Sequence, residues 1–111
     1  MNIIEEINAI IHDIEKEINS LSKDTKKKLK NNVYSMGYSY LNTVETRPEK
    51  YYAFVLEKPW FKDYKLILKS SDEIKINSED YKVYKNYENL EIFDIESLVK
   101  IKYFLLSFIG E

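Results

Sequence analysis

The feature that most constrains the fold is a row of apolar residues near the N-terminus, spaced alternately three and four positions apart. This seam consists of Ile4, Ile7, Ile11, Ile14, Ile18 and Leu21. Heptad spacing places all its members on one stripe of an α-helix, which can then lie flat against another surface. Residues 3–21 contain neither glycine nor proline, and Ile3 and Ile10 widen the stripe. We therefore predict an amphipathic helix over residues 3–21.

The seam has two interpretations. It is either the core face of a helix within one chain or a self-complementary surface between the two copies of a homodimer. Its length of about three heptads is marginal for an isolated coiled coil, so the helix needs further contacts in either case. Both interpretations stay open.

Length and composition limit the class of protein. With 111 residues, 44% of them hydrophobic, the chain can bury a core, and we predict a single domain over residues 1–111. The absence of cysteine excludes disulfides, cysteine-ligated metals and cysteine nucleophiles. The N-terminal segment carries Glu5 and Glu6 and lacks the basic start of a secretory signal. No apolar run has the length that crosses a bilayer. We expect a cytoplasmic protein that does not associate with a membrane.

Charge is unevenly distributed along the chain. The net charge is −2, but residues 1–20 carry −4, residues 21–70 carry +6 and residues 71–111 carry −4. This segregation predicts a basic face on a mildly acidic molecule. Ile, Lys, Asn and Tyr supply 49 of the 111 residues, and all four have AT-rich codons. Abundant lysine is therefore weaker evidence of function here than in a chain of average composition.

The segment 25–43 fits two structures. Four residues at helical spacing would make a second helix that pairs with the first: Leu29, Val33, Met36 and Tyr40. Large side chains in 34–40 also alternate with serine and glycine, as they do in a strand. We favour the helix because the lysine-rich residues before this segment are good helix formers and Ser22 or Asp24 offers an N-cap.

The segment 51–92 predicts a small antiparallel sheet, since aromatic and β-branched residues alternate there with polar ones. The expected strands cover residues 51–57, 64–69, 73–77 and 81–87, and the expected turns cover 58–63, 70–72 and 77–80. A capping-box pattern that starts at Thr46 offers a helix over 47–57 instead. The aromatic residues beside Val55 favour the strand.

A final helix is predicted to begin after Asp94 as its N-cap, with Phe93 packed on Leu98, and to end at Gly110. Apolar residues cover more than half its circumference, so we expect burial on more than one side. The elements combine into an α+β fold: an N-terminal amphipathic helix with a helical partner, a small antiparallel sheet and a buried C-terminal helix.

Catalytic patterns are weak. The single histidine, His12, shares a predicted helix face with Glu15, as a general base with an orienting carboxylate does and as an ordinary charged helix face also does. Two glycines leave no phosphate-binding loop, and one histidine without cysteine argues against a transition-metal site. We predict no catalytic residue, no metal and no cofactor, and hence a protein that is not an enzyme.

The stronger of two binding patterns is the loop around residues 59–61. The only tryptophan, Trp60, precedes Phe61, with Lys58, Lys62 and Tyr64 nearby. An aromatic centre with a charged rim is typical of a protein-binding hot spot. In the alternative interpretation, both rings fold back over the core beneath a hairpin.

The second pattern is the densest basic run of the chain, which tyrosines follow: Lys26, Lys27, Lys28, Lys30, Tyr34 and Tyr38. Basic charge beside stacking aromatic rings is how proteins hold single-stranded nucleic acid. The mildly acidic composition argues against this use.

From these patterns we predict a non-enzymatic module that binds another protein and inhibits it by occupying its surface. Size and composition favour a mobile-element protein, such as a phage inhibitor of a bacterial defence complex or an immunity protein that neutralises a toxin. The alternative is a small nucleic-acid-binding protein that uses residues 23–30.

Overall fold

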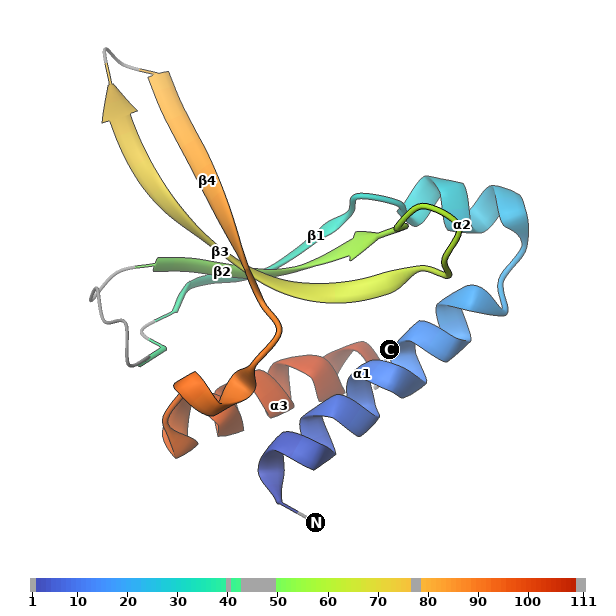
Figure 1. The fold of residues 1–111 in the computed structure, drawn as a ribbon, viewed down its shortest axis with the longest axis horizontal. Helices are drawn as coiled ribbons and strands as arrows, with labels where there is room; N and C mark the ends of the chain where they lie inside the picture. The colour runs from blue at the N-terminus through green and yellow to red at the C-terminus, as the bar shows by residue number, and fades with distance from the viewer. Residues whose placement is uncertain (1, 40, 43–49, 77–78, 110–111) are drawn as a thin grey trace.

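The computed structural model describes residues 2–39, 41–42, 50–76 and 79–109 of the chain, and they form an α+β fold (Figure 1). The helical elements are α1 (Ile3–Asn19), α2 (Lys23–Leu29), the short 3₁₀ helix η1 (Leu90–Ile92) and α3 (Ile95–Ile109). The strands are β1 (Val33–Ser39), β2 (Lys50–Glu57), β3 (Lys65–Ile76) and β4 (Glu79–Tyr87). They form one antiparallel sheet in the order β1-β2-β3-β4.

The core lies between one face of the sheet and the two long helices, α1 and α3 (Figure 1). Tyr52, Phe54 and Leu56 of β2 point to this face and are almost completely buried, and Ala53 and Val55, which alternate with them and point to the other face, are buried too. Phe54 stacks on Phe104 of α3 with ring centroids 6.1 Å apart. Each fully buried side chain of this size contributes about 1.5–3 kcal/mol to folding.

The heptad seam is the core face of α1. Ile7 and Ile14 are buried, and the other isoleucines of the seam are partly buried and packed against the same core. Only Leu21, which is 40% exposed and follows the end of α1, stands outside this packing. The intramolecular interpretation is therefore confirmed. Four of the six seam residues keep part of their surface exposed, so the use of the seam as a dimer surface stays a prediction.

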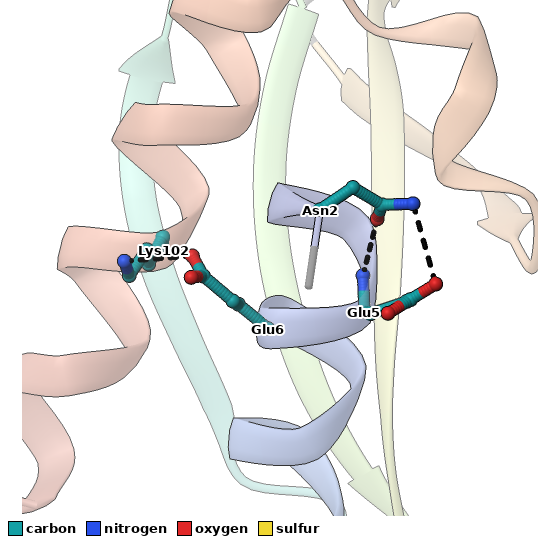
Figure 2. A network of polar contacts seen from close by, with 4 residues as sticks. All are labelled: Asn2, Glu5, Glu6 and Lys102. Carbon is teal, nitrogen blue, oxygen red and sulfur yellow. Dashed lines mark hydrogen bonds and ion pairs between the residues drawn. The ribbon is translucent and has the colours of Figure 1, made fainter.

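An ion pair connects the two long helices. Glu6 of α1 accepts a hydrogen bond from Lys102 of α3 across 2.9 Å between Oε2 and Nζ (Figure 2). This hydrogen bond, with the negative charge of Glu6, raises the pKa of Lys102. Figure 2 also shows the N-cap of α1, where the backbone N–H of Glu5 donates to the side-chain oxygen of Asn2 at 2.9 Å. Such a cap satisfies a backbone donor that the first helical turn leaves unpaired.

Asp94 caps α3, as predicted. Its carboxylate accepts hydrogen bonds from the backbone N–H of Ser97 at 2.8 Å and from the side-chain amide of Asn42 at 3.1 Å. Hydrogen bonds from Ser97 and then Asn42 hold the pKa of Asp94 below its usual value. The helix itself buries one side only, because Ile95 and Tyr103 are exposed. Burial of a second side within this chain is therefore wrong, burial under a partner stays a prediction, and the predicted end at Gly110 lies outside the described residues.

The favoured helix over residues 25–43 is wrong over 30–39 and 41–42, because α2 ends at Leu29 and β1 begins at Val33, while residues 40 and 43 lie outside the described residues. Helix α2 ends at Leu29 because Asn31 adopts the left-handed backbone conformation, with φ of 66°. Asparagine tolerates this conformation and often stops a helix in this way. The backbone N–H of Asn32 then bonds to the carbonyl of Leu29 at 3.0 Å and closes the turn. The strand pattern noted in this segment is therefore the correct one.

Strand β3 passes straight through residues 70–72, where a turn was predicted. Ser70 pairs with Tyr52 of β2 and with Lys85 of β4, and its buried hydroxyl donates to the Tyr87 hydroxyl at 3.1 Å. Serine favours a turn when its side chain bonds to nearby backbone, and this side chain bonds instead to a neighbouring strand. Beyond Ser71, β3 pairs with β4 alone, and this two-stranded ribbon extends away from the helices (Figure 1).

Smaller corrections concern element ends. Residues 77 and 78 of the predicted 77–80 turn lie outside the described residues, and Glu79 and Asp80 belong to β4. The helix alternative for 47–57 is wrong over 50–57, which is β2, while residues 43–49 are not described. The last residues of the predicted sheet segment 51–92 lie outside the sheet, since residues 90–92 form η1.

Candidate protein-binding loop

The loop between β2 and β3 exposes the two largest apolar side chains of its sequence. Trp60 is 86% exposed and Phe61 is 95% exposed. Their rings contact each other edge to face, with centroids 5.5 Å apart. The interpretation in which both rings fold back over the core is therefore wrong. An exposed aromatic pair is the kind of surface feature that marks a contact site.

A tight turn presents these rings. The backbone N–H of Lys62 donates to the carbonyl of Pro59 at 3.2 Å, so Trp60 and Phe61 occupy the two central positions of the turn. Phe61 has a φ of 58°, in the left-handed region that normally takes glycine or asparagine at this position. A bulky residue there costs about 1–2 kcal/mol. The chain therefore keeps a strained phenylalanine whose ring makes little contact with the core.

Side chains of α1 hold the base of this loop. Asn19 makes a two-point contact with the backbone of Tyr64: its Oδ1 accepts from the Tyr64 N–H at 2.9 Å and its Nδ2 donates to the Tyr64 carbonyl at 3.1 Å. Glu15 accepts from the N–H of Leu66 at 2.9 Å. The pairing of β4 with β3 starts only at Leu68. The two α1 side chains thus satisfy backbone groups along a β3 edge that β4 does not reach.

Helix α2 lies beside the same loop (Figure 1). Lys26 places its ammonium 5.8 Å from the centre of the Tyr64 ring and within 3.5 Å of the Asn19 carbonyl. On the other side, the N–H of Asn31 donates to the carbonyl of Leu56 at 2.7 Å. These contacts connect the middle of α2 to Tyr64, at the end of the loop, and the turn after α2 to Leu56 of β2. Tyr64, predicted as a partner contact, is instead a buried residue under Lys26.

The loop and α2 together form what we call the aromatic–basic surface, which consists of Trp60, Phe61, Lys27, Lys28, Lys30, Lys58 and Lys62. All seven residues are exposed. Among the described residues, no ion pair involves any of these lysines. The surface therefore combines an apolar centre with cations that face water.

His12 does not form a dyad with Glu15. The imidazole is exposed at the edge of an open surface cavity of about 540 Å³ between α1 and the loop, whereas the Glu15 carboxylate accepts from Leu66. Within the described part of the chain, no group of three or more histidine, cysteine, aspartate or glutamate residues is placed to hold a metal ion.

The tyrosines predicted to stack on nucleic acid are not available as a group. The Tyr34 ring packs edge to face on Phe108, with centroids 4.9 Å apart, and the side chain of Tyr38 is not described. Lys26 is half-buried against the loop. The contact of Lys26 with Tyr64 therefore places the basic run beside the loop that carries Trp60 and Phe61, and not beside a group of exposed tyrosines.

Two positioning residues, Asn19 and Glu15, were missed by sequence reasoning. Both contact backbone atoms more than 40 positions away, and backbone partners leave no pattern in the sequence. In contrast, Asn31 and Asn32 are a recognisable stop signal for α2, and reading them would have located β1.

No protein-family model matches the sequence, and no curated protein or solved structure is significantly similar to it. Among the residues that the structure describes, none of the helices combines the length and apolar composition that crossing a membrane requires.

Proposed function

We propose that this chain is a protein-binding module whose contact is centred on Trp60 and Phe61. The observation that carries the proposal is the exposure of both rings on a turn whose backbone is strained at Phe61 and hydrogen-bonded at its base to Asn19. Folding gains little from either ring in this position. A binding role explains why the two rings are kept, because burying them against a partner gives the free energy that folding does not.

The expected binding energy is that of a hot spot. Covering one large aromatic ring contributes about 2–3 kcal/mol, and interface hot spots are enriched in tryptophan for this reason. The turn is held by its own hydrogen bond and by α1. A loop that is already ordered loses less conformational entropy when it binds, which leaves more of this energy for affinity.

The mode of action proposed is occupation of the partner's surface without chemical change. A chain of this kind inhibits or neutralises its partner, as a phage inhibitor of a bacterial defence complex or an immunity protein does. Size and composition support this finer statement, and the identity of the partner decides it.

The experiment begins by identifying the partner. A photo-crosslinking phenylalanine analogue at position 61 is compared with the same analogue at Tyr103, which is 67% exposed on α3. We expect position 61 to crosslink one protein that position 103 does not. Binding of that purified protein is then measured with Trp60→Ala and Tyr103→Ala.

Trp60→Ala should weaken the affinity at least tenfold, which corresponds to about 1.4 kcal/mol or more. Tyr103→Ala should change it less than threefold. Because Trp60 is exposed, the thermal unfolding of both variants should stay close to that of the parent chain. If Trp60→Ala binds within about threefold of the parent chain while remaining folded, Trp60 is not a hot spot and the proposal is wrong.

A further inference from the structure

We infer that the partner surface that receives this loop is acidic around an apolar pocket. The inference rests on the proposed function and adds the chemistry of the partner. Residues 23–30 contain five lysines and one aspartate, and residues 58–65 contain three lysines and one aspartate. The contacts of Lys26 and Asn31 place these two segments next to each other, so their charges act on the same region of solvent.

Although Asp24 and Asp63 belong to the same two segments, no ion pair among the described residues joins a lysine of the aromatic–basic surface to an acidic residue. Lys69 forms an ion pair with Glu57 on the sheet, and Lys102 pairs with Glu6 between the helices. Within the described ranges, neither of these pairs reaches the aromatic–basic surface. The lysines of this surface outnumber its carboxylates, so a complementary partner presents carboxylates around the pocket that takes the rings.

An acidic protein fits this surface better than a nucleic acid does. The Trp60 and Phe61 rings are inclined at 67°, whereas successive bases stack on platforms that each present an open ring face. The regions before and after residues 21–70 each carry −4, and these charges repel a polyphosphate that runs beyond the loop. A compact protein surface contacts the loop and α2 alone.

The local electrostatic claim is tested with Trp60 itself, since it is the only tryptophan. Its fluorescence is quenched separately by iodide and by caesium, and the ratio of the two quenching constants is compared with that of Lys27→Gln/Lys28→Gln/Lys30→Gln. We expect a ratio at least twofold higher in the parent chain, because the lysines concentrate iodide around the ring. Lys100→Gln, on α3, is the matched control and should leave the ratio unchanged. An equal ratio in the parent chain and the triple variant overturns the inference.

The ligand class is tested with defined probes on the intact chain. Emission of Trp60 is followed during titration with a short peptide of glutamate, leucine and phenylalanine, with the same peptide carrying glutamine for glutamate, with oligothymidylate, and with phosphatidylcholine–phosphatidylserine vesicles. The acidic peptide should bind and shift the emission to shorter wavelength, and both the glutamine peptide and the triple lysine variant should weaken binding about tenfold.

The possible results separate this inference from the proposed function. If the crosslinked partner depends on Trp60 but binds the triple lysine variant as well as the parent chain, the acidic surface is wrong and the protein-binding role stands. Tighter binding to oligothymidylate or to vesicles than to the acidic peptide overturns the inference and assigns the surface to that ligand. No binding of the acidic peptide to the parent chain also overturns it.

Discussion

Phe61 combines a backbone conformation with φ of 58° and a side chain that is 95% exposed. The strained backbone lowers the stability of the fold, and the exposed ring adds little stability because it is not buried. Asn19 presents the opposite case, because a half-buried amide on α1 satisfies both backbone groups of Tyr64. Phe61 should therefore lower the stability of the fold while contributing to binding, and Asn19 should raise the stability and hold the loop in place.

Replacing Phe61 with glycine tests the first case. Glycine adopts positive φ without strain, although it also gains entropy in the unfolded chain. We expect Phe61→Gly to raise the free energy of unfolding by about 0.5–1 kcal/mol, measured by urea denaturation, while affinity for the crosslinked partner falls more than tenfold. A loss of stability in this variant would show that the phenylalanine ring supports the fold, and the strain argument would fail.

Replacing Asn19 with alanine tests the second case. The variant leaves the N–H and carbonyl of Tyr64 without their side-chain partner, which costs about 1–3 kcal/mol. Asn8→Ala is the matched control, since Asn8 is an exposed asparagine of the same helix. Urea denaturation of both variants gives the comparison. Equal stability of the two variants would mean that water replaces the Asn19 contacts without cost.

At the level of elements, the sequence predicted those that its own periodicity determines. The heptad row gave α1, and the Asp94 cap with a staple gave the start of α3. Local chemistry also located the loop of Trp60 and Phe61, but it left open whether the two rings face solvent or fold back over the core. The features that the sequence could not show depend on contacts between residues far apart in the chain. The Ser70 hydroxyl bonds to Tyr87 on the neighbouring strand and not to a nearby turn. Lys26 packs over the Tyr64 ring and is not exposed with the other lysines of the basic run.

The Asp94 cap of α3 makes the stability of the fold depend on pH. Because the pKa of Asp94 is lowered in the folded chain, its stabilising effect is complete above the ordinary carboxyl pKa and disappears as the pH falls through the folded value. Asp94→Asn keeps an N-cap but removes the charge. We expect this variant to be less stable than the parent chain at neutral pH, and the difference to shrink as the pH falls through the carboxyl range.

Urea denaturation at several pH values between neutral and acid measures this difference. Glu96→Gln is the control, because it removes a carboxylate from the same helical turn and leaves the contacts with Asn42 and Ser97 in place. A stability difference between Asp94→Asn and the parent chain that stays constant across this range would contradict the role of the charged cap.

In the molecule as a whole, helix α1 has two structural roles. Its inward face packs with α3 and the sheet to form the core, and its C-terminal end contacts both the loop and α2. The same helix thus fixes both the fold and the surface proposed for binding. Its apolar seam, which as a sequence pattern is equally compatible with a dimer, packs against the core of this chain, with Ile7 and Ile14 buried there.

This packing predicts folding that does not depend on self-association. If the seam joined two copies, the unfolding midpoint would rise with protein concentration. We expect a constant midpoint over a hundredfold range of concentration, together with a loss of about 2–5 kcal/mol for Ile14→Ala, because Ile14 is buried in the core. Leu21→Ala should change stability by less than about 0.5 kcal/mol, since this residue lies at the exposed end of the seam. The opposite result is an unfolding midpoint that rises with protein concentration, and rises less in Leu21→Ala. That result would identify the seam as a dimer interface.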